Sequence, residues 1–276
     1  MTRFRNSKRA SKTLNERRQG NTSNNKSGAS VKFERQLAWP CRDCDVRGLS
    51  LCKSLTDRVG ADTSASKNHI PQVFFRIDKG AIVQESGSQF IPGPYLLCQG
   101  WAYRFYRFPD GRRQILSVII PGDLFSAFAL FNTQSGFSVE AATDIHVCQF
   151  GRAEIRNELS DNVEFSEAFG RLCVAEVEDI ARTSINLTSS NAAERIAGFV
   201  RSVVDRLIAR GISDGVNLYP FPLTQTEIAD ATGLTSLEVQ AAIHILQDEY
   251  VMSFANAQVT ILNSVKIANL APVAIR

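Results

Sequence analysis

Three cysteines lie close together near the N-terminus at a spacing that suits a metal centre. They follow the pattern Cys41-x2-Cys44-x7-Cys52. Thiolates separated by two residues can turn onto one metal centre, and a third thiolate can reach it across a short loop. Three ligands leave such a centre incomplete, so a fourth is required. From ligand type alone, an iron–sulfur cluster, a zinc ion and the absence of any metal all remain open.

The rest of the sequence does not predict catalysis. No nucleophile–base pair, glycine-rich phosphate loop or convergent pair of carboxylates stands out, so we do not expect an enzyme. Cys98 and Cys173 stand alone, and we expect them to pack in a core, as isolated cysteines usually do.

The composition is that of a globular protein. The chain has 276 residues, 44 % of them hydrophobic, which suggests two domains. The longest apolar runs, such as residues 115–121, are far shorter than the roughly 20 residues that a membrane-spanning helix needs. The N-terminus lacks the apolar core of a signal peptide. We therefore expect a cytoplasmic protein with no membrane partner, whose cysteines are reduced thiols rather than disulfides.

Residues 1–36 form a basic arm. They carry ten Lys and Arg residues against two Glu, a net charge of +8, so the remaining residues sum to −5 of the chain's total of +3. Large apolar side chains are few, and we expect the arm to be disordered. Such an arm can bind nucleic acid, although a solvated leader with no partner is the simpler interpretation.

The sequence of residues 37–163 predicts a cysteine segment followed by a β-rich domain. From about Val73 to Gln149 short β segments alternate with turns, and the turns at Pro109-Asp110-Gly111 and Pro121-Gly122-Asp123 are strong signals. Many short strands with glycine-centred turns favour a small antiparallel barrel or jelly roll.

Residues 164–190 predict a long helix with a dimerisation seam. Its candidate seam positions fall at alternating steps of four and three residues, as in helices that pair with a second copy of themselves. Ser184 interrupts the seam, and the same helix could instead pack on its own barrel. A homodimer is the expected assembly. The seam positions are Cys173, Val177, Ile180, Ser184 and Leu187.

Residues 191–276 predict a winged helix-turn-helix. Asn191 is placed to cap a helix that Gly211 ends. Two further helices, 224–231 and 235–250, flank a tight turn at Thr232-Gly233-Leu234, and a hairpin follows over 251–261. The second of these helices is expected to face double-stranded DNA through Thr235, Ser236, Glu238 and Gln240.

The order of these elements, together with four short motifs, resembles the Crp/Fnr family of transcription regulators over about residues 38–262. The resemblance implies an α+β fold: an N-terminal β-roll (a cyclic-nucleotide-binding-like jelly roll), a long dimerisation helix and a C-terminal winged helix-turn-helix. It also implies RNA polymerase as a partner. The motifs are Pro109 to Ile115 (PDGRRQI), Pro121 to Leu124 (PGDL), Asn191 to Ile196 (NAAERI), and Leu223 to Ala229 (LTQTEIA) with Gly233-Leu234-Thr235.

The cysteines are similar to those of the oxygen-sensing Fnr branch of this family. In that branch three N-terminal cysteines and one cysteine in the roll hold a [4Fe–4S] cluster. The resemblance implies that Cys148 joins Cys41, Cys44 and Cys52 as the fourth ligand. Loss of the cluster in oxygen would release the cysteine segment from the roll and bias the dimer contacts. Whether oxygen or nitric oxide is the natural signal stays open.

A cyclic-nucleotide ligand is the other option within the family. It would require an Arg-Ser pair for the phosphate, and none occurs between Asp123 and Val139. An apolar lining cannot pair a buried phosphate charge, so we do not expect cyclic AMP to bind.

The reader domain departs from the family pattern. Leu237, Gln240 and Ala241 stand where Fnr-type readers place Glu, Ser and Arg, so we expect an atypical DNA sequence specificity. Between residues 222 and 263 there are five acids and no Lys or Arg. DNA affinity depends largely on cations, so a second hypothesis stands beside DNA binding: a sensor or dimer partner that has lost DNA reading and acts through protein contacts. The remaining candidate cations are the arm, Arg195, Arg201, Arg206 and Arg210.

Overall fold

The computed structural model describes residues 33–36, 72–88, 93–131, 134–189 and 191–271. The expected disorder of residues 1–32 and the three cysteines of the N-terminal segment lie outside these ranges. Within them, no helix is both long enough and apolar enough to cross a bilayer.

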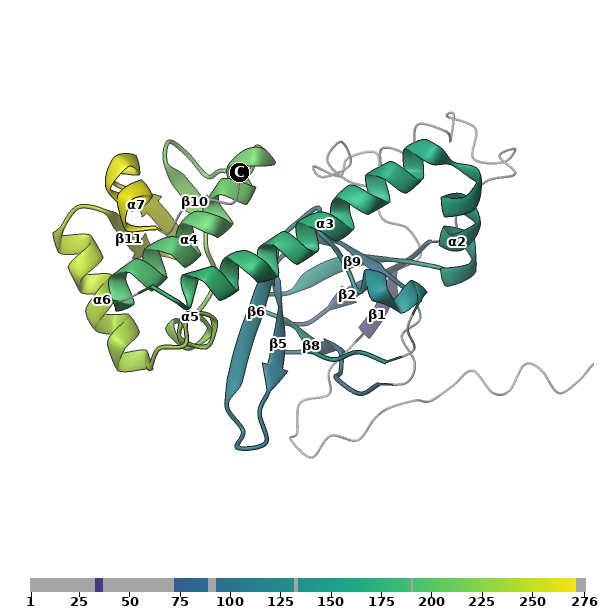
Figure 1. Ribbon diagram of the computed structural model, residues 1–276, viewed down its shortest axis with the longest axis horizontal. Coiled ribbons are helices and arrows are strands. Elements are labelled where there is room, and N and C mark those ends of the chain that lie inside the picture. Colours follow the sequence, from purple (N-terminus) through teal and green to yellow (C-terminus); the bar gives the residue numbers. More distant parts are fainter. Residues whose placement is uncertain (1–32, 37–71, 89–92, 132–133, 190, 272–276) are drawn as a thin grey trace, which may run out of the picture. The chain divides into compact units, whose positions relative to one another are not determined.

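Two antiparallel sheets form the β-roll that the sequence predicted (Figure 1). One has the strand order β1-β2-β9-β4-β7 and the other the order β3-β8-β5-β6. Two short strands, β3 and β7, were missed because two or three residues carry no readable alternation. The strands are β1 (Phe33–Gln36), β2 (Gln72–Ile77), β3 (Ile82–Gln84), β4 (Tyr95–Gln99), β5 (Ala102–Arg107), β6 (Arg113–Ile119), β7 (Leu124–Phe125), β8 (Ser138–Ala141) and β9 (Ile145–Phe150).

The first strand corrects one expectation. The sequence places residues 33–36 in the disordered arm, but they form β1, which pairs with β2 from Phe33↔Ile77 to Gln36↔Phe74. The polar composition of the arm hid this strand because its hydrogen-bond partners are the backbone groups of an existing sheet edge, which make few demands on side chains.

The long helix predicted at 164–190 is α3 (Val163–Asn186), preceded by α2 (Arg152–Asp161). The side chain of Asn162 caps α3 by accepting a hydrogen bond from the Phe165 nitrogen at 3.1 Å. Phe165 and Phe169 on its first turns are buried in an apolar cluster with residues of the roll. Figure 1 shows α3 running from α2 along the roll towards α4 and α5. The helix thus connects the roll to the C-terminal elements.

The C-terminal elements form a winged helix-turn-helix, as predicted. Thr224 and Thr235 each begin a helix with a reciprocal capping box, and Gly233 makes the turn between them with a φ of 65°. Strand β10 and helix α7 were not predicted, because each is short and β10 ends on a proline. The elements are α4 (Ala192–Ala209), β10 (Leu218–Pro220), α5 (Gln225–Thr232), α6 (Ser236–Asp248), β11 (Met252–Ala255), β12 (Gln258–Ile261) and α7 (Ser264–Leu270).

One apolar core joins part of the roll to the winged helix-turn-helix. Trp101, Tyr103 and Phe105 of the roll belong to the same buried cluster as Phe199 and Phe221. Trp101 and Phe221 meet edge to face, with ring centroids 5.9 Å apart. Movement of the reader elements therefore disturbs packing within the roll.

Candidate sensor core and nucleic-acid interface

Cys148 lies in the sheet core of the roll. It is only 1 % exposed and sits in the middle of β9, opposite Phe74 on β2 and Leu96 on β4. Cys41, Cys44 and Cys52 lie outside the described residues. Inside them, no group of three or more His, Cys, Asp or Glu side chains is arranged to hold a metal ion. The part of the chain that the structure describes thus supplies Cys148 alone of the predicted ligands.

Cys98 and Cys173 pack against the same apolar cluster as Cys148. Both are half-buried. Burial, with a smaller contribution from Glu176, raises the pKa of the Cys173 thiol to about 11. A thiol with such a pKa is protonated at neutral pH and is a poor nucleophile. This agrees with the expectation of core packing.

The interior of the roll beside α3 is filled by an ion pair. Arg104 on β5 is 2 % exposed, pairs with Glu176 of α3 and donates to the Ser117 hydroxyl at 2.7 Å. The space left between these side chains is about 10 Å³, which is room for roughly one water molecule. Arg104 and Glu176 therefore join α3 to the roll.

A second group of ion pairs joins the roll, α3 and α4. The Asp123 carboxylate pairs with Arg206 and Arg210 near the end of α4, and Arg206 also reaches Asp179 of α3 at 3.0 Å. Burial alone would raise the pKa of Asp123, but the two guanidinium groups outweigh it and hold that pKa below its usual value. At Asp179 burial prevails and raises the pKa to about 6. Asp123 is thus charged at neutral pH, and Arg206 and Arg210 are both engaged in ion pairs with it.

Arg113 connects the roll to the reader domain at a different place. Its Nε donates to Asp230 of α5 at 2.7 Å, and its Nη1 donates to the Tyr103 hydroxyl at 2.7 Å. Glu140 of β8 completes the group at 3.2 Å from Nη1. Sequence reasoning used the motifs around Asp123 and Arg113 only as marks of the fold. Their cross-element partners had no signal in the sequence.

The predicted reader helix is α6, and its start is occupied by its own cap. Glu238 accepts hydrogen bonds from the Thr235 nitrogen at 2.7 Å and from the Thr235 hydroxyl at 2.8 Å. These bonds lower the pKa of Glu238. Ser236 and Gln240 are exposed beside them, and so is Leu237, at 76 %. Two of the four predicted DNA contacts are therefore bonded to each other.

The cations expected from α4 are mostly engaged within the chain. Arg206 and Arg210 pair with Asp123, and Arg201 donates to the Ala268 carbonyl at 3.2 Å. Arg195 donates to the Ser189 carbonyl at 3.1 Å. After residue 210, the first cationic side chain in the sequence is that of Lys266 in α7, which donates to the Glu249 carbonyl at 2.6 Å. The described part of the reader domain thus offers little positive charge for phosphate.

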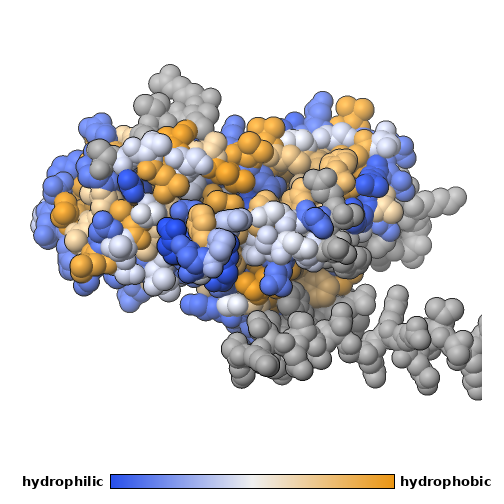
Figure 2. Space-filling model, turned by 60° about the horizontal axis from the view of Figure 1, so that its bottom comes forward, coloured by the Kyte–Doolittle hydropathy of each residue, from blue (hydrophilic) through white to orange (hydrophobic). Residues whose placement is uncertain are grey.

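The structure divides the predicted dimer seam on α3. Val177 is 66 % exposed and Ser184 is exposed, whereas Cys173, Ile180 and Leu187 are half-buried in their own chain. Two further apolar side chains of α3 are exposed, Val174 at 58 % and Ile185 at 36 %. On the face seen in Figure 2, hydrophobic residues are scattered among hydrophilic ones. Of Val174, Val177 and Ile185, the exposed apolar side chains in this part of α3, only Val177 therefore belongs to the predicted seam.

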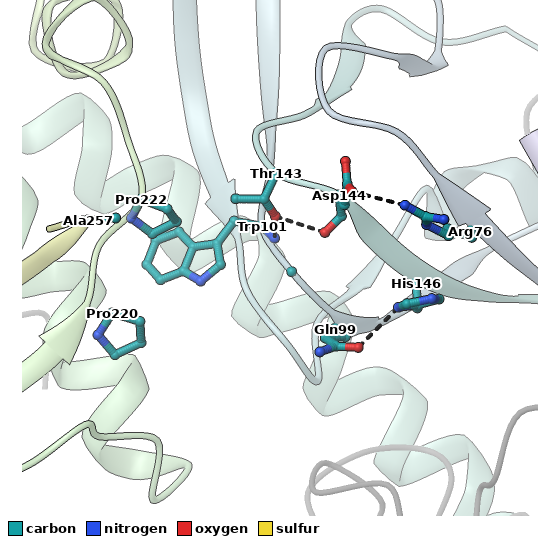
Figure 3. A pocket seen from close by; sticks show the side chains of 10 residues that line it. Arg76, Gln99, Trp101, Thr143, Asp144, His146, Pro220, Pro222 and Ala257 are labelled. Carbon is teal, nitrogen blue, oxygen red and sulfur yellow. Dashed lines mark hydrogen bonds and ion pairs between the residues drawn. The ribbon is translucent and has the colours of Figure 1, made fainter. Parts of the chain in front are cut away.

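An open pocket of about 670 Å³ lies between the end of the roll and the wing (Figure 3). Its polar side chains already pair with one another: Arg76 with Asp144 at 3.1 Å, and His146 with Gln99 at 3.0 Å. Trp101 points towards the wing side of the pocket (Figure 3). Because its charges are matched internally, the pocket indicates no particular ligand.

Comparison with known proteins gives a consistent result. Residues 74–162 match the family model described as a cyclic nucleotide-binding domain. The chain is 25 % identical over 232 residues to the nitrogen fixation regulation protein FixK of Bradyrhizobium diazoefficiens, covering 84 % of this chain and 93 % of that protein. It is 24 % identical over 246 residues to the transcriptional activator protein FnrA of Stutzerimonas stutzeri, covering 88 % and 96 %.

The fold also matches a solved structure. The structure of FixK2 from Bradyrhizobium japonicum matches with a TM-score of 0.65 and 21 % identity, covering 74 % of this chain and all of that one. These similarities confirm the fold class that the sequence predicted. They also confirm that the chain resembles regulators rather than enzymes.

Proposed function

We propose that this chain, a Crp/Fnr-family transcription regulator by sequence and fold, binds DNA as a homodimer and responds to oxygen through a [4Fe–4S] cluster. Its ligands are Cys41, Cys44, Cys52 and Cys148. The observation that carries the proposal is the position of Cys148: a thiol 1 % exposed in the middle of β9, in a chain whose N-terminal segment holds three more cysteines at ligand spacing.

The donor chemistry fits the cluster. Four thiolates are the usual ligand set of a [4Fe–4S] centre, and an apolar surrounding such as that of Cys148 limits solvent access to it. The cluster supplies the reaction with oxygen, and the chain supplies the attachment of the cysteine segment to β9. Zinc would accept the same four thiolates, so a measurement of the metal content distinguishes a zinc site from the cluster. Thiol ligands require the reducing conditions of a cytoplasm.

Cyclic AMP is not part of the proposed function. Arg104 and Glu176 occupy the interior of the roll beside α3, where about 10 Å³ remains. A nucleotide at this place would have to separate Arg104 from Glu176 and leave the largely buried Glu176 carboxylate without its cation, which is unfavourable.

The dimer forms along α3 in this proposal. Val177 and Ser184 of the predicted seam are exposed, and Val174 and Ile185 lie beside them. The other three seam residues, Cys173, Ile180 and Leu187, are half-buried, and they pack beneath the exposed side chains of the seam. Exposed valines at positions 174 and 177 follow the three-residue step of a helix–helix seam.

DNA reading is atypical in this proposal. Ser236 and Gln240 are the exposed polar side chains at the start of α6 that are free to meet base edges, while Thr235 and Glu238 fix the helix start. Gln240 suits adenine. The helix N-terminus itself donates to phosphates. RNA polymerase is the further partner that the family resemblance implies.

The decisive experiment measures iron and DNA binding on the same protein. Full-length chain purified without air is compared with Cys148→Ser and with Cys98→Ser, a matched control in the same apolar cluster that is not a proposed ligand. We expect a broad visible absorption band and about four irons per chain in the wild type and in Cys98→Ser, and neither in Cys148→Ser.

DNA binding is then tested with pooled random duplexes before and after exposure to air. Sequence-selective binding that is lost together with the absorption band supports the proposal. Full iron content in Cys148→Ser would refute the ligand assignment. Stoichiometric zinc in place of iron would refute the oxygen response.

A second function is favoured by one observation. The exposed face of α6 carries Leu237 at 76 % exposure and Ile245 at 49 %, and the domain lacks Lys and Arg from residue 222 to 263. An apolar helix face in an acidic domain suits a protein partner better than DNA. A loaded cluster with no DNA binding even at low salt would select this function.

A further inference from the structure

The side chain of Cys148 belongs to a row of buried residues that crosses three strands. On β4, Leu96 is paired with Cys148 of β9 on one side and with Leu124 of β7 on the other. All three are at most 3 % exposed and share one apolar cluster. Directly opposed residues of antiparallel strands lie on the same face of the sheet. A displacement at Cys148 therefore presses on Leu96 and then on Leu124.

The end of this row is bonded to Asp123, the residue before Leu124. The Leu97 nitrogen donates to the Asp123 carbonyl at 3.0 Å, and the Gly122 nitrogen donates to the Leu97 carbonyl at 2.8 Å. The Asp123 carboxylate also accepts from the Ile120 nitrogen at 2.8 Å. Asp123 is thus fixed to β4 through its backbone and held in one orientation through its side chain.

The Asp123 side chain is in turn the roll's ionic contact with α4. Each carboxylate oxygen meets one guanidinium, Oδ2 that of Arg206 and Oδ1 that of Arg210. The same two arginines also donate to roll carbonyls, Arg206 to Val118 at 2.9 Å and Arg210 to Pro121 at 2.6 Å. All three charged side chains are at most 16 % exposed. Buried ion pairs of this kind are made or broken as a whole, because a lone buried charge is costly.

We propose that Asp123 is the positioning residue through which the state of Cys148 reaches the reader domain. Cys148, Leu96 and Leu124 form a packed row, and packed interiors transmit displacement rather than absorb it. Asp123 converts a shift of that row into a change in its ion pairs with Arg206 and Arg210. Since Arg206 lies in the last turn of α4 and Arg210 is the residue that caps its C-terminus, the change alters the attachment of α4 to the roll. Coupling of this kind needs a contact with two arrangements, and the Asp123 ion pairs are that contact.

The inference rests on the proposed function in one respect, that Cys148 holds a cluster. The route from Cys148 through Leu96 and Leu124 to Asp123 does not depend on that cluster. Two substitutions distinguish loss of the cluster from a disturbance of the packed row. Cys148→Ser removes the proposed ligand, while Leu96→Ala makes a cavity in the row without touching any proposed ligand. Each is combined in the full-length chain with Asp123→Asn, with the milder Arg210→Gln, and with Asp110→Asn. The last is the control, an exposed aspartate paired with Arg112 on the β5–β6 turn.

The readout is amide hydrogen exchange in peptides of α4, which needs neither iron nor DNA. We expect each perturbation to change the exchange rate of α4 about threefold or more in the wild-type and Asp110→Asn backgrounds. We expect little change in the Asp123→Asn background, where both ion pairs are lost, and a smaller change than in the wild type in the Arg210→Gln background, where only the pair with Arg210 is lost. If Asp123→Asn does not fold, Arg210→Gln decides, because it leaves the pair of Asp123 with Arg206.

Two results would overturn the inference. One is an equal response of α4 in all backgrounds, which would mean that another route carries the coupling. The other is no response of α4 to Leu96→Ala in the wild-type background. Failure of the proposed function looks different, because the wild type then lacks iron or air-sensitive DNA binding while the response of α4 to Leu96→Ala still depends on Asp123.

Discussion

Arg113 Nε in the roll lies 2.7 Å from Asp230 Oδ2 in the first helix of the helix-turn-helix motif, although the two residues are 117 positions apart in the chain. The side chains are 17 % and 21 % exposed, and Gln114 beside them donates to the Ala231 carbonyl at 3.4 Å. The first residues of β6 therefore fix α5, and α5 in turn fixes the orientation of α6.

Replacing Arg113 should loosen α5. In Arg113→Gln, Asp230 and Glu140 lose their cation, and we expect the free energy of unfolding to fall by about 1–2 kcal/mol. Urea unfolding checks the stability, and amide exchange in α5 checks the location. Arg112→Gln is the matched control: its side chain is 76 % exposed, so a change of less than about 0.5 kcal/mol is expected. Equal losses in the two variants would contradict a special role for Arg113.

The basic arm should supply the DNA affinity that the reader domain lacks. The variant removes residues 1–30 and keeps β1, which begins at Phe33. This segment carries eight Lys and Arg residues and one Glu. The slope of log affinity against log salt becomes shallower by about 0.9 for every phosphate that the protein no longer neutralises. We expect a shallower slope and weaker binding, measured by fluorescence anisotropy at several salt concentrations.

A second arm variant separates charge from length. It retains residues 1–30 but changes their eight Lys and Arg residues to Gln. If charge is what matters, this variant behaves like the truncation. A salt slope equal to that of the wild type in either variant would show that the arm makes no phosphate contacts.

A charge on the exposed face of α3 should disrupt the dimer. In Val177→Glu two carboxylates would be brought together and desolvated at the interface, and we expect dimerisation to weaken by at least tenfold, which corresponds to about 1.4 kcal/mol. Sedimentation velocity at several concentrations measures this. Val265→Glu on α7 is the control, since Val177 and Val265 are both 66 % exposed. A dimer that survives Val177→Glu would place the interface elsewhere.

Asp179 should make stability depend on pH. Its pKa rises from 3.8 to about 6 in the folded protein because of burial, so between these values the folded state binds more protons than the unfolded state. The contribution of this group to stability is therefore greatest below pH 4 and declines as pH rises through 6. Asp179→Asn removes that decline. We expect the variant to gain stability relative to the wild type between pH 4 and pH 7, measured by urea unfolding.

Asp205→Asn serves as the control for this comparison. Asp205 makes a surface pair with Arg201, and its side chain is 44 % exposed. The stability of the Asp205→Asn variant relative to the wild type should therefore change little over the same pH range. A flat difference between Asp179→Asn and the wild type would show that Asp179 is not buried in solution.

Local rules determined much of what the sequence predicted correctly. Capping residues such as Thr224 and Thr235 act within one helical turn, and the glycine of a tight turn needs only its own positive φ. These interactions are the same wherever the element lies. They defined most strands of the roll, the long helix, the helix-turn-helix and, with the motif order, the family. The metal site is a prediction of the same local kind for Cys41, Cys44 and Cys52, and of the family resemblance for Cys148.

Only the tertiary structure decided which side chains meet across the chain. The sequence treated Arg206 and Arg210 as cations available to DNA, but the fold pairs both with Asp123, more than 80 residues away. It included Cys173 with Val177 in the dimer seam, whereas the fold packs Cys173 against the roll and leaves Val177 exposed together with Val174, which the sequence did not include. A periodic pattern gives the spacing of a helix face but not its direction, and a charge gives no sign of its partner, because both depend on contacts between segments that are remote in sequence.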